Sequence, residues 1–369
     1  MIQKIRNGWQ SMLKSSKTFL VIGICMQLAI TVPIITFLIY AAIPLRSPQS
    51  GFDWTPETNF AGFYSIAGHE VLMPQDRDMR ILMLSDLHLA FIWNGRTLRH
   101  ITRLVNEADP DLIVLMGDSF GHLLNDVGAR QLINHMDNFE IPWAPILGNH
   151  DQRGKATRDR IAHMLGNTNF GLFLYGPNSL REFSGNYFIN LVRPRTGGTE
   201  IVHSLYMLGS GTNRLGSERY PNPPQGQIDW YDWAVRGNRE MHRISDARSS
   251  IMVHTPFREF DSAWYRGDVL FGDRNEPTRS PESTAEFFER VVYLDCTVNI
   301  FAGHNHDDYF SAMYRGIQMT NVLNGGRPWL FQSLPRMLRT DAPRGGTLLT
   351  VNPQTGATDV RHIFTNRSE

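Results

Sequence analysis

The chain has 369 residues, of which 36 are basic and 36 are acidic. This length allows one large folded domain with its own core, or at most two small ones. The neutral balance excludes a general nucleic-acid binder, because such proteins carry a basic excess or a basic stripe. Two cysteines, one of them inside an apolar run, exclude a disulfide framework and a cysteine zinc site. Any metal must therefore be held by His, Asp, Glu or Asn.

An uncharged, mostly aliphatic segment runs from Thr18 to Leu45. As a helix it would be roughly 42 Å long at about 1.5 Å per residue, more than the roughly 30 Å hydrocarbon core of a bilayer. A cleavable signal peptide has a shorter apolar region, of about 7–15 residues, although Ala41 and Ala42 keep a cleaved signal open as an alternative. The segment predicts a transmembrane signal-anchor helix over residues 18–45, which places the protein in a lipid bilayer.

The charges around this segment predict its orientation. Residues 1–17 contain no acid and four basic residues, Lys4, Arg6, Lys14 and Lys17. Acidic residues follow soon after the apolar segment, at Asp53 and Glu57. By the positive-inside rule, residues 1–17 form a short cytoplasmic N-terminus, and everything after Leu45 lies outside the cytoplasm. This predicts a single-pass membrane protein whose large domain faces the periplasm or exterior of a bacterium, or a secretory lumen or the cell surface of a eukaryote.

Residues 46–75 are rich in Gly, Pro and aromatic residues, and we interpret them as a juxtamembrane linker that precedes the main domain over residues 76–369. From Arg80 on, short apolar runs end abruptly in clusters of Asp, Asn, His and Gly. Such runs are typical of strands buried on both faces. They are Ile81–Leu84, Leu112–Met116, Trp143–Leu147, Ile251–Val253 and Val298–Ala302. Thr347–Val351, in the last fifty or so residues, is a further strand candidate that is expected to finish a second sheet.

Stretches with helical spacing lie between the apolar runs. They are Thr97–Ala108, Ala129–Met136, Thr157–Met164 and Gln227–Val235. Ser283 with Glu286 three residues later is a capping-box pattern that predicts one more helix. The alternation of strands and helices predicts an α/β architecture with a largely buried sheet.

Each of the five apolar runs is followed by side chains that can bind a metal. These segments are Asp86-Leu87-His88, Gly117-Asp118, Gly148-Asn149-His150-Asp151, His254 and Gly303-His304-Asn305-His306. Ligands gather at the carboxyl ends of strands in open α/β sheets, so the five segments are expected to converge. Residues two apart in an extended chain point the same way, which is expected to bring Asp86 and His88 to one site, and likewise His304 and His306. The glycines allow sharp turns and close approach of the backbone.

The number and type of these groups indicate two metal ions. Six or seven nitrogen and oxygen ligands exceed what one metal needs, but they match two metals that share a bridging carboxylate. Ligation without thiolates suits Mn, Fe or Zn, as two divalent or mixed-valence ions. Two cations about 3.5–4 Å apart can stabilise both oxygens of an in-line displacement at phosphorus and acidify a water as nucleophile. The sequence thus predicts a metal-dependent hydrolase of phosphate esters.

Residues from about 78 to 340 resemble the calcineurin-like metallophosphoesterase superfamily, and within it the purple-acid-phosphatase-like branch. The stretches that carry the resemblance to the branch are Ile141–Gln152, Gly185-Asn186-Tyr187, Gln227-Ile228-Asp229-Trp230 and Gly303–Phe310. The resemblance implies a four-layer α/β/β/α sandwich, in which helices flank two sheets, in addition to the N-terminal transmembrane helix.

The resemblance also implies a role for each site residue. One set would hold the first metal, namely Asp86, His88 and His306. A second set would hold the other metal, namely Asn149, His254 and His304, and Asp118 would bridge both. His150 would contact the scissile phosphate and protonate the leaving oxygen, as a general acid.

Gly121 stands three residues after the implied bridging aspartate. Purple acid phosphatases have at this position the tyrosine that colours their iron, and many other superfamily members have an aspartate that orients the catalytic histidine. We therefore expect no purple chromophore, and the group that orients His150 stays open. Of the remaining histidines, His122 lies nearest to the site in sequence.

Three functions are compatible with the sequence. The first is hydrolysis of a phosphomonoester or phosphodiester outside the cytoplasm. The second is a phospholipid or lipid-linked pyrophosphate hydrolase, because the anchor keeps the site near the bilayer and Phe91, Ile92 and Trp93 could form a membrane-facing lip. The third, from another class, is a non-catalytic scaffold or receptor stabilised by metal, against which the complete ligand set counts.

Overall fold

The computed structural model of the chain describes residues 2–48, 50–89, 94–121, 124–152, 154–212, 220–244, 248–326 and 343–365. It divides into two compact units, residues 1–44 and residues 45–369. The first unit contains helix α1 (Ile2–Ala42). The stretch Phe19–Tyr40 within α1 has a mean hydropathy of 2.3 and is long and apolar enough to cross a membrane, a property that signal sequences share.

Helix α1 ends before Leu45, the end expected from the apolar segment. Pro44 explains the earlier end, because the residue before a proline is pushed out of the helical conformation. Leu45 belongs to the second unit, where its N–H donates to the Lys155 carbonyl at 2.7 Å.

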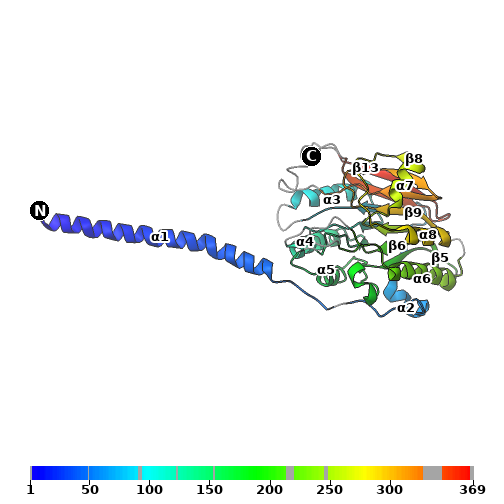
Figure 1. Cartoon of the computed structure of the whole chain (residues 1–369), viewed down its shortest axis with the longest axis horizontal. Coiled ribbons are helices and arrows are strands. Elements are labelled where there is room, and N and C mark those ends of the chain that lie inside the picture. Colours follow the sequence, from blue (N-terminus) through cyan, green and yellow to red (C-terminus); the bar gives the residue numbers. More distant parts are fainter. Residues whose placement is uncertain are drawn as a thin grey trace. The chain divides into compact units, whose positions relative to one another are not determined.

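The second unit is a four-layer sandwich, as the sequence resemblance implied (Figure 1). One sheet has five strands in the order β13-β12-β2-β3-β4, and the other has eight in the order β1-β5-β6-β7-β9-β11-β10-β8. Figure 1 shows helices α3, α4 and α5 on one side of the two sheets and α6 and α8 on the other. The inner faces of both sheets contribute to one core, and the outer face of the eight-stranded sheet packs against its helices in a second core.

The five-stranded sheet contains the first three predicted strands. Its members are β2 (Met79–Leu84), β3 (Leu112–Leu115), β4 (Trp143–Pro145), β12 (Gly345–Val351) and β13 (Thr358–Phe364). Strands β2, β3 and β4 are parallel, and β12 is antiparallel to β2. Ile81, Leu82 and Leu84 of β2 are fully buried, which explains why the strand has a continuous apolar run instead of an alternating one.

The eight-stranded sheet contains the last two predicted runs. Its members are β1 (Gly68–Leu72), β5 (Tyr187–Arg195), β6 (Gly198–Leu208), β7 (Arg248–Val253), β8 (Asp268–Phe271), β9 (Thr297–Ala302), β10 (Ser311–Tyr314) and β11 (Ile317–Asn321). Strands β6, β7, β9 and β11 are parallel neighbours. The carboxyl ends of β7 and β9 therefore lie at the same edge of the sheet.

The described helices of this unit are α2 (Phe60–Ala67), α3 (Gly95–Ala108), α4 (Asn125–Asp137), α5 (Arg158–Leu165), η1 (Asn178–Phe183, a 3-10 helix), α6 (Gln225–His242), α7 (Glu259–Arg266) and α8 (Ala285–Leu294). Five of them, α3, α4, α5, α6 and α8, lie where the sequence predicted them, whereas α2, η1 and α7 were not predicted. Thr157 caps α5, since its side chain accepts a hydrogen bond from the Arg160 N–H. In α3, Ile101, Leu104 and Val105 are buried at the spacing that one helix face requires.

Three details differ from the sequence-based expectations. Residues 60–72, inside the expected linker, form α2 and β1, and β1 pairs with β5. The predicted capping box at Ser283 is wrong: α8 begins after Thr284, whose hydroxyl donates to Glu259 Oε2 at 2.6 Å instead of capping the helix. Strands β12 and β13 join β2, so the end of the chain completes the five-stranded sheet that contains the first predicted strands, not a separate sheet.

Candidate metal centre

The eight predicted site residues follow five strands, and both sheets contribute. Residues Asp86, His88, Asp118, Asn149 and His150 follow β2, β3 and β4 of the five-stranded sheet. His254, His304 and His306 follow β7 and β9 of the eight-stranded sheet. Because all five strands present their carboxyl ends to this region, the side chains of distant segments come within a few ångströms of one another. Six of the eight form two groups of three that could each hold a metal ion.

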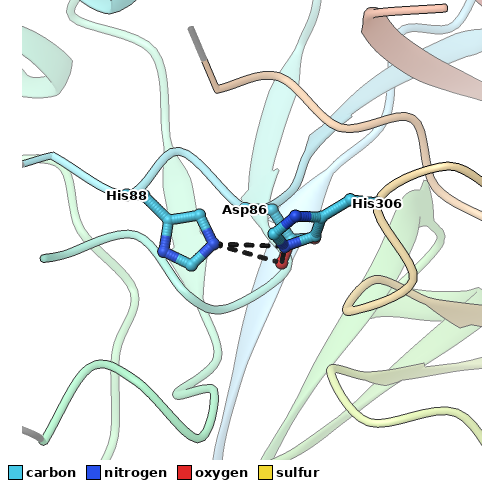
Figure 2. Close-up of side chains that lie close together, drawn as sticks. All are labelled: Asp86, His88 and His306. Atoms are coloured by element: carbon cyan, nitrogen blue, oxygen red, sulfur yellow. Dashed lines mark hydrogen bonds and ion pairs between the residues drawn. The ribbon is translucent and has the colours of Figure 1, made fainter. Parts of the chain in front are cut away.

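The first group consists of Asp86, His88 and His306. His306 Nε2 lies 3.0 Å from Asp86 Oδ1, and His88 Nε2 lies 3.7 Å from the same oxygen. The two imidazole nitrogens are 3.2 Å apart. Figure 2 shows both rings directed at the Asp86 carboxylate. Asp86 is 1% exposed, so this group is a largely buried cluster of one oxygen and two nitrogen donors.

The second group consists of Asp118, His254 and His304, all buried. His254 Nε2 lies 3.2 Å from Asp118 Oδ2, and His304 Nδ1 lies 3.3 Å from His254 Nε2. The other ring nitrogen of His254, Nδ1, is 2.8 Å from the Met116 carbonyl oxygen. A hydrogen bond from Nδ1 to this carbonyl sets the tautomer and orients the ring, so Nε2 faces the carboxylate.

Two carboxylates connect the groups. Asp86 Oδ2 accepts a hydrogen bond from the His304 N–H at 2.9 Å, so a residue of the first group supports the backbone of the second. Asp118 Oδ1 accepts from the His150 N–H at 2.7 Å, and Asp118 Oδ2 is 3.8 Å from His150 Nε2. The His150 ring also meets the His88 ring edge to face, with centroids 5.4 Å apart. The two groups and His150 are therefore parts of one centre.

Two buried polar atoms of this centre indicate that it fits metal ions. Asn149 Oδ1 and His304 Nε2 have no hydrogen-bond partner among the described residues. A buried polar atom without a partner costs about 1–3 kcal/mol, and a bound cation would offset that cost for an oxygen or nitrogen ligand. Asn149 is 1% exposed and comes directly after Gly148, beside the second group. The donor set of nitrogens, carboxylates and an amide, without thiolates, fits first-row divalent ions.

The charged side chains of the two ligand groups shift one another's pKa values. Burial opposes ionisation of Asp86 and Asp118, but the neighbouring imidazoles outweigh it and hold the pKa of both carboxyls below the usual range. Burial also opposes a charge on His254, but Asp118 raises its pKa to about 10. Burial lowers the pKa of His88 to about 3 and that of His304 well below its ordinary value. The centre thus keeps ionised carboxylates in a buried place, which favours cation binding.

The backbone at the ligands is not extended. Asp86, His88, Asp118 and His304 have φ angles of 56°, 46°, 50° and 70°, in the left-handed region that non-glycine residues rarely adopt. The expectation that i, i+2 pairs face one way in an extended chain was therefore wrong in its geometry. Asp86 and His88 still share a group, but His304 and His306 belong to different groups. Residues with such strained backbone angles are often found at functional sites, where the surrounding structure holds them in place.

The three glycines permit the close approach that the sequence predicted. A Cβ at Gly148 would lie 2.3 Å from Asp118 Oδ1, and one at Gly303 would lie 2.0 Å from Ser85 Oγ. Gly117 has a φ of 89°, and its Cβ would lie 2.6 Å from the His254 ring. No larger residue fits at these positions without moving a ligand or its neighbour.

The sequence analysis counted Asp151 among the side chains that can bind a metal without giving it a role of its own, and it did not consider Ser85. The Asp151 carboxylate accepts the N–H groups of Asp118 at 2.9 Å, Phe120 at 2.9 Å and Gly148 at 2.7 Å, which ties the loop after β3 to the loop after β4. Burial and the Asp118 charge raise the pKa of Asp151 to about 7. Ser85 donates to Asp86 Oδ2 at 2.5 Å. The one sequence signal for the role of Asp151 in joining these loops is its position two residues after Asn149.

Other candidates from the sequence lie elsewhere. Asn305 is turned away from the ligand groups: its Oδ1 accepts the Arg279 N–H at 3.2 Å and its Nδ2 donates to Asp308 Oδ2 at 2.9 Å. His122, and the predicted lip of Phe91, Ile92 and Trp93, lie outside the described residues.

Two adjoining groups of His and Asp at the strand ends of a two-sheet sandwich are the arrangement of the metallophosphoesterase fold. The sequence model of the family described as calcineurin-like phosphoesterase matches residues 79–308, more than half of the chain, and the protein belongs to this family.

Similar proteins come from several organisms. The chain is 26% identical over 287 residues to probable inactive purple acid phosphatase 14 of Arabidopsis thaliana, covering 66% of this chain and 69% of that protein. It is 23% identical over 270 residues to phosphatase DCR2 of Saccharomyces cerevisiae, covering 62% of this chain and 44% of that protein. Among solved structures, a dimetal phosphatase from Danio rerio superposes with a TM-score of 0.51 at 10% identity, over 77% of this chain and 95% of that one, which supports the fold.

Proposed function

We propose that the protein is a membrane-anchored, dinuclear metal-dependent phosphoesterase. The observation that carries the proposal is the pair of adjoining ligand groups, Asp86–His88–His306 and Asp118–His254–His304, which are linked through Asp86 Oδ2 and the His304 N–H at 2.9 Å. A single metal ion would leave one group unused. Two bound ions would offset the negative charge that develops on the phosphoryl oxygens during an in-line displacement.

In this proposal each residue has one role. The first ion would be held by Asp86, His88 and His306. The second would be held by His254, His304 and Asn149, whose Oδ1 has no hydrogen-bond partner among the described residues. Asp118 would be the ligand shared by both ions. When bound, the ions, of Mn, Fe or Zn, polarise the phosphoryl oxygens and supply an acidified water as nucleophile.

His150 is proposed to be the proton donor. Its backbone is fixed by the bond from its N–H to Asp118 Oδ1, whereas its side chain is 26% exposed, unlike the buried second group. It thus lies on the accessible side of the centre, where a substrate must enter. We propose that Nε2 holds a proton and delivers it to the ester oxygen that leaves, as a general acid does.

The membrane topology is also a proposal. The Phe19–Tyr40 stretch supports a bilayer anchor over residues 18–45. The basic residues before it support a cytoplasmic N-terminus of residues 1–17. The linker of residues 46–75 and the phosphoesterase domain of residues 76–369 would then lie outside the cytoplasm, where a phosphate ester in the lumen, periplasm or exterior is the substrate.

A non-catalytic metal-stabilised scaffold is the second candidate. The names of three plant relatives, which are called probable inactive purple acid phosphatases, favour it. The complete ligand groups and the partly exposed His150 favour the enzyme.

The deciding experiment uses the full chain in detergent. The protein is stripped of metal, reloaded with Mn²⁺, Fe²⁺ or Zn²⁺, and assayed with p-nitrophenyl phosphate and bis(p-nitrophenyl) phosphate beside the His150→Ala variant. Metal-dependent turnover that is lost in the variant supports the enzyme. A phospholipid in mixed micelles is assayed in the same way, and its turnover alone would identify a lipid hydrolase. Calorimetric binding of two ions per chain without turnover of any of the three substrates would contradict the enzyme and leave the scaffold.

A further inference from the structure

Arg158, the first residue of α5, is buried at 7% exposure. Its guanidinium donates from Nε to Ser184 Oγ at 2.7 Å and from Nη2 to the Ser184 carbonyl at 2.9 Å. Its Nη1 donates to Gln152 Oε1 at 2.6 Å and to the Ser210 carbonyl at 3.0 Å. All these acceptors are neutral oxygens. Burial lowers the pKa of Arg158 to about 10, so the group is still charged at neutral pH.

The segments that Arg158 connects lead directly to the second ligand group. Gln152 stands two residues after His150. Ser210, just beyond the end of β6, donates its N–H to the Leu147 carbonyl at 3.0 Å, and its Oγ accepts the Thr255 N–H at 3.1 Å. Leu147 precedes Gly148 and Asn149 in the chain, and Thr255 directly follows His254. One guanidinium therefore links the loops of Asn149, His150 and His254 through Gln152 and Ser210.

Burial of the Arg158 cation costs free energy that its neutral hydrogen-bond acceptors and the nearby carboxylate of Asp151 offset only in part. An apolar side chain of similar volume at such a position is often as stabilising or more so. What the guanidinium adds is geometry, because its donors lie in one rigid plane and fix several acceptors at once. The acceptors here come from three segments, the loop after β4, the turn after η1 and the loop after β6.

We propose that Arg158 and Ser210 are positioning residues for the second metal group and for His150. The inference rests on the proposed dinuclear phosphoesterase function. Arg158 holds the Gln152 end of the loop that carries Asn149 and His150. Ser210 holds the same loop at Leu147 and the His254 loop at Thr255, so the distance between Asn149 and His254 depends on both residues. The first group, Asp86–His88–His306, receives no contact from this network in the part of the chain that the structure describes.

Three variants separate the parts of the network. Arg158→Gln removes the planar guanidinium and with it the hydrogen bonds to several segments. Ser210→Ala removes the acceptor of the Thr255 N–H and leaves the Arg158 bond to the Ser210 carbonyl. Gln152→Met removes only the link to the His150 loop. Arg181→Gln is the matched control, because Arg181 pairs with the neighbouring Asp159 and not with the site loops.

The primary readout is Zn²⁺ binding to the metal-free full chain, measured by calorimetry. Outer-shell partners change metal affinity by about 10–100-fold. We expect Arg158→Gln and Ser210→Ala each to lower the affinity for one of the two Zn²⁺ ions about tenfold. The loss should persist in a His88→Ala background, which impairs the first group, and vanish in a His304→Ala background, which impairs the second. Arg181→Gln should bind both ions as the wild type does.

The secondary readout is the dependence of turnover on the leaving group. Gln152→Met is expected to lower kcat about tenfold for phenyl phosphate, which needs a proton on its leaving oxygen, and to change it little for 2,4-dinitrophenyl phosphate, which does not. Its Zn²⁺ affinity should remain that of the wild type.

The outcomes are distinct. The positioning role is overturned if the variants weaken the binding of both ions equally. It is also overturned if both affinities are unchanged and only the melting temperature falls, as a simple packing defect would cause. If Arg158→Gln fails to fold, Ser210→Ala decides, since an unchanged second ion in that variant overturns the proposal too. A wild-type chain that binds fewer than two ions contradicts the proposed function itself, and is seen before any variant is compared.

Discussion

Replacing Gly148 by alanine is expected to disable the centre by a single methyl group. The added Cβ would lie 2.3 Å from Asp118 Oδ1, 2.5 Å from the Asp118 backbone nitrogen and 2.9 Å from the His254 ring. None of these atoms can retreat freely. Asp118 Oδ1 accepts the His150 N–H, the Asp118 nitrogen donates to Asp151 Oδ2, and the His254 ring is buried.

The size of the effect follows from these distances. Ordinary contact between carbon and its neighbours begins near 3.5 Å, so either the new methyl group or Asp118 must move by roughly 1 Å. A misplacement of about 1 Å at a catalytic centre costs around 100-fold in rate, which is about 2.7 kcal/mol in activation free energy. Overpacking of the buried loop should also lower the free energy of unfolding by about 1–3 kcal/mol.

The assay is kcat/KM for p-nitrophenyl phosphate at saturating Mn²⁺, with calorimetric metal affinity as a second measurement that does not need turnover. Gly62→Ala is the matched control, because a Cβ at Gly62 in α2 meets only Asn59 Oδ1, at 3.9 Å. A Gly148→Ala protein that binds two ions with wild-type affinity and keeps more than a third of kcat/KM would refute the reasoning, since the ligand positions would then tolerate the shift.

Three further outcomes are expected. His150→Ala should lower kcat by about 10²–10⁴-fold for phenyl phosphate but far less for 2,4-dinitrophenyl phosphate, and equal losses for both esters would argue against a proton-donor role. Removing metal with EDTA should lower the melting temperature, because each ion present at about 100 times its Kd contributes about 2.7 kcal/mol; an unchanged melting temperature would show that no ion binds the folded state preferentially. Burial lowers the pKa of His203 to about 3, so the unfolded chain, with an ordinary imidazole, takes up a proton that the folded chain refuses. The metal-free protein should therefore lose stability as pH falls below about 6.5, with His203 contributing roughly 2 kcal/mol between pH 7.5 and 5. His203→Gln keeps a donor for Ser250 Oγ. In this variant the free energy of unfolding, measured with urea, should depend less on pH between about 7.5 and 5, and an unchanged dependence would show that His203 is not its source.

The types of the site residues could be predicted because they are local in sequence. Strands buried on both faces need continuous apolar side chains, so β2 and β3 stand out as runs, and the ligating residues follow directly at their ends. Six of the eight predicted residues form the two ligand groups, and the backbone of His150 is bonded to Asp118 of the second group. Gly117, Gly148 and Gly303 were indicated in the same way, because each stands beside a ligand whose close approach excludes a Cβ.

The geometry of the centre was decided only by the tertiary structure. The alternation rule holds while the chain is extended, but β2 ends at Leu84 and β9 at Ala302, before their ligands, and the left-handed backbone at Asp86 and His304 sets the directions instead. That is why His304 and His306 serve different groups. The supporting contacts of Asp151 and Arg158 join segments far apart in sequence, and the division of the five strands between two sheets depends on which faces pack together. Sequence by itself determined which side chains can bind metal; packing between the sheets determined which of them meet.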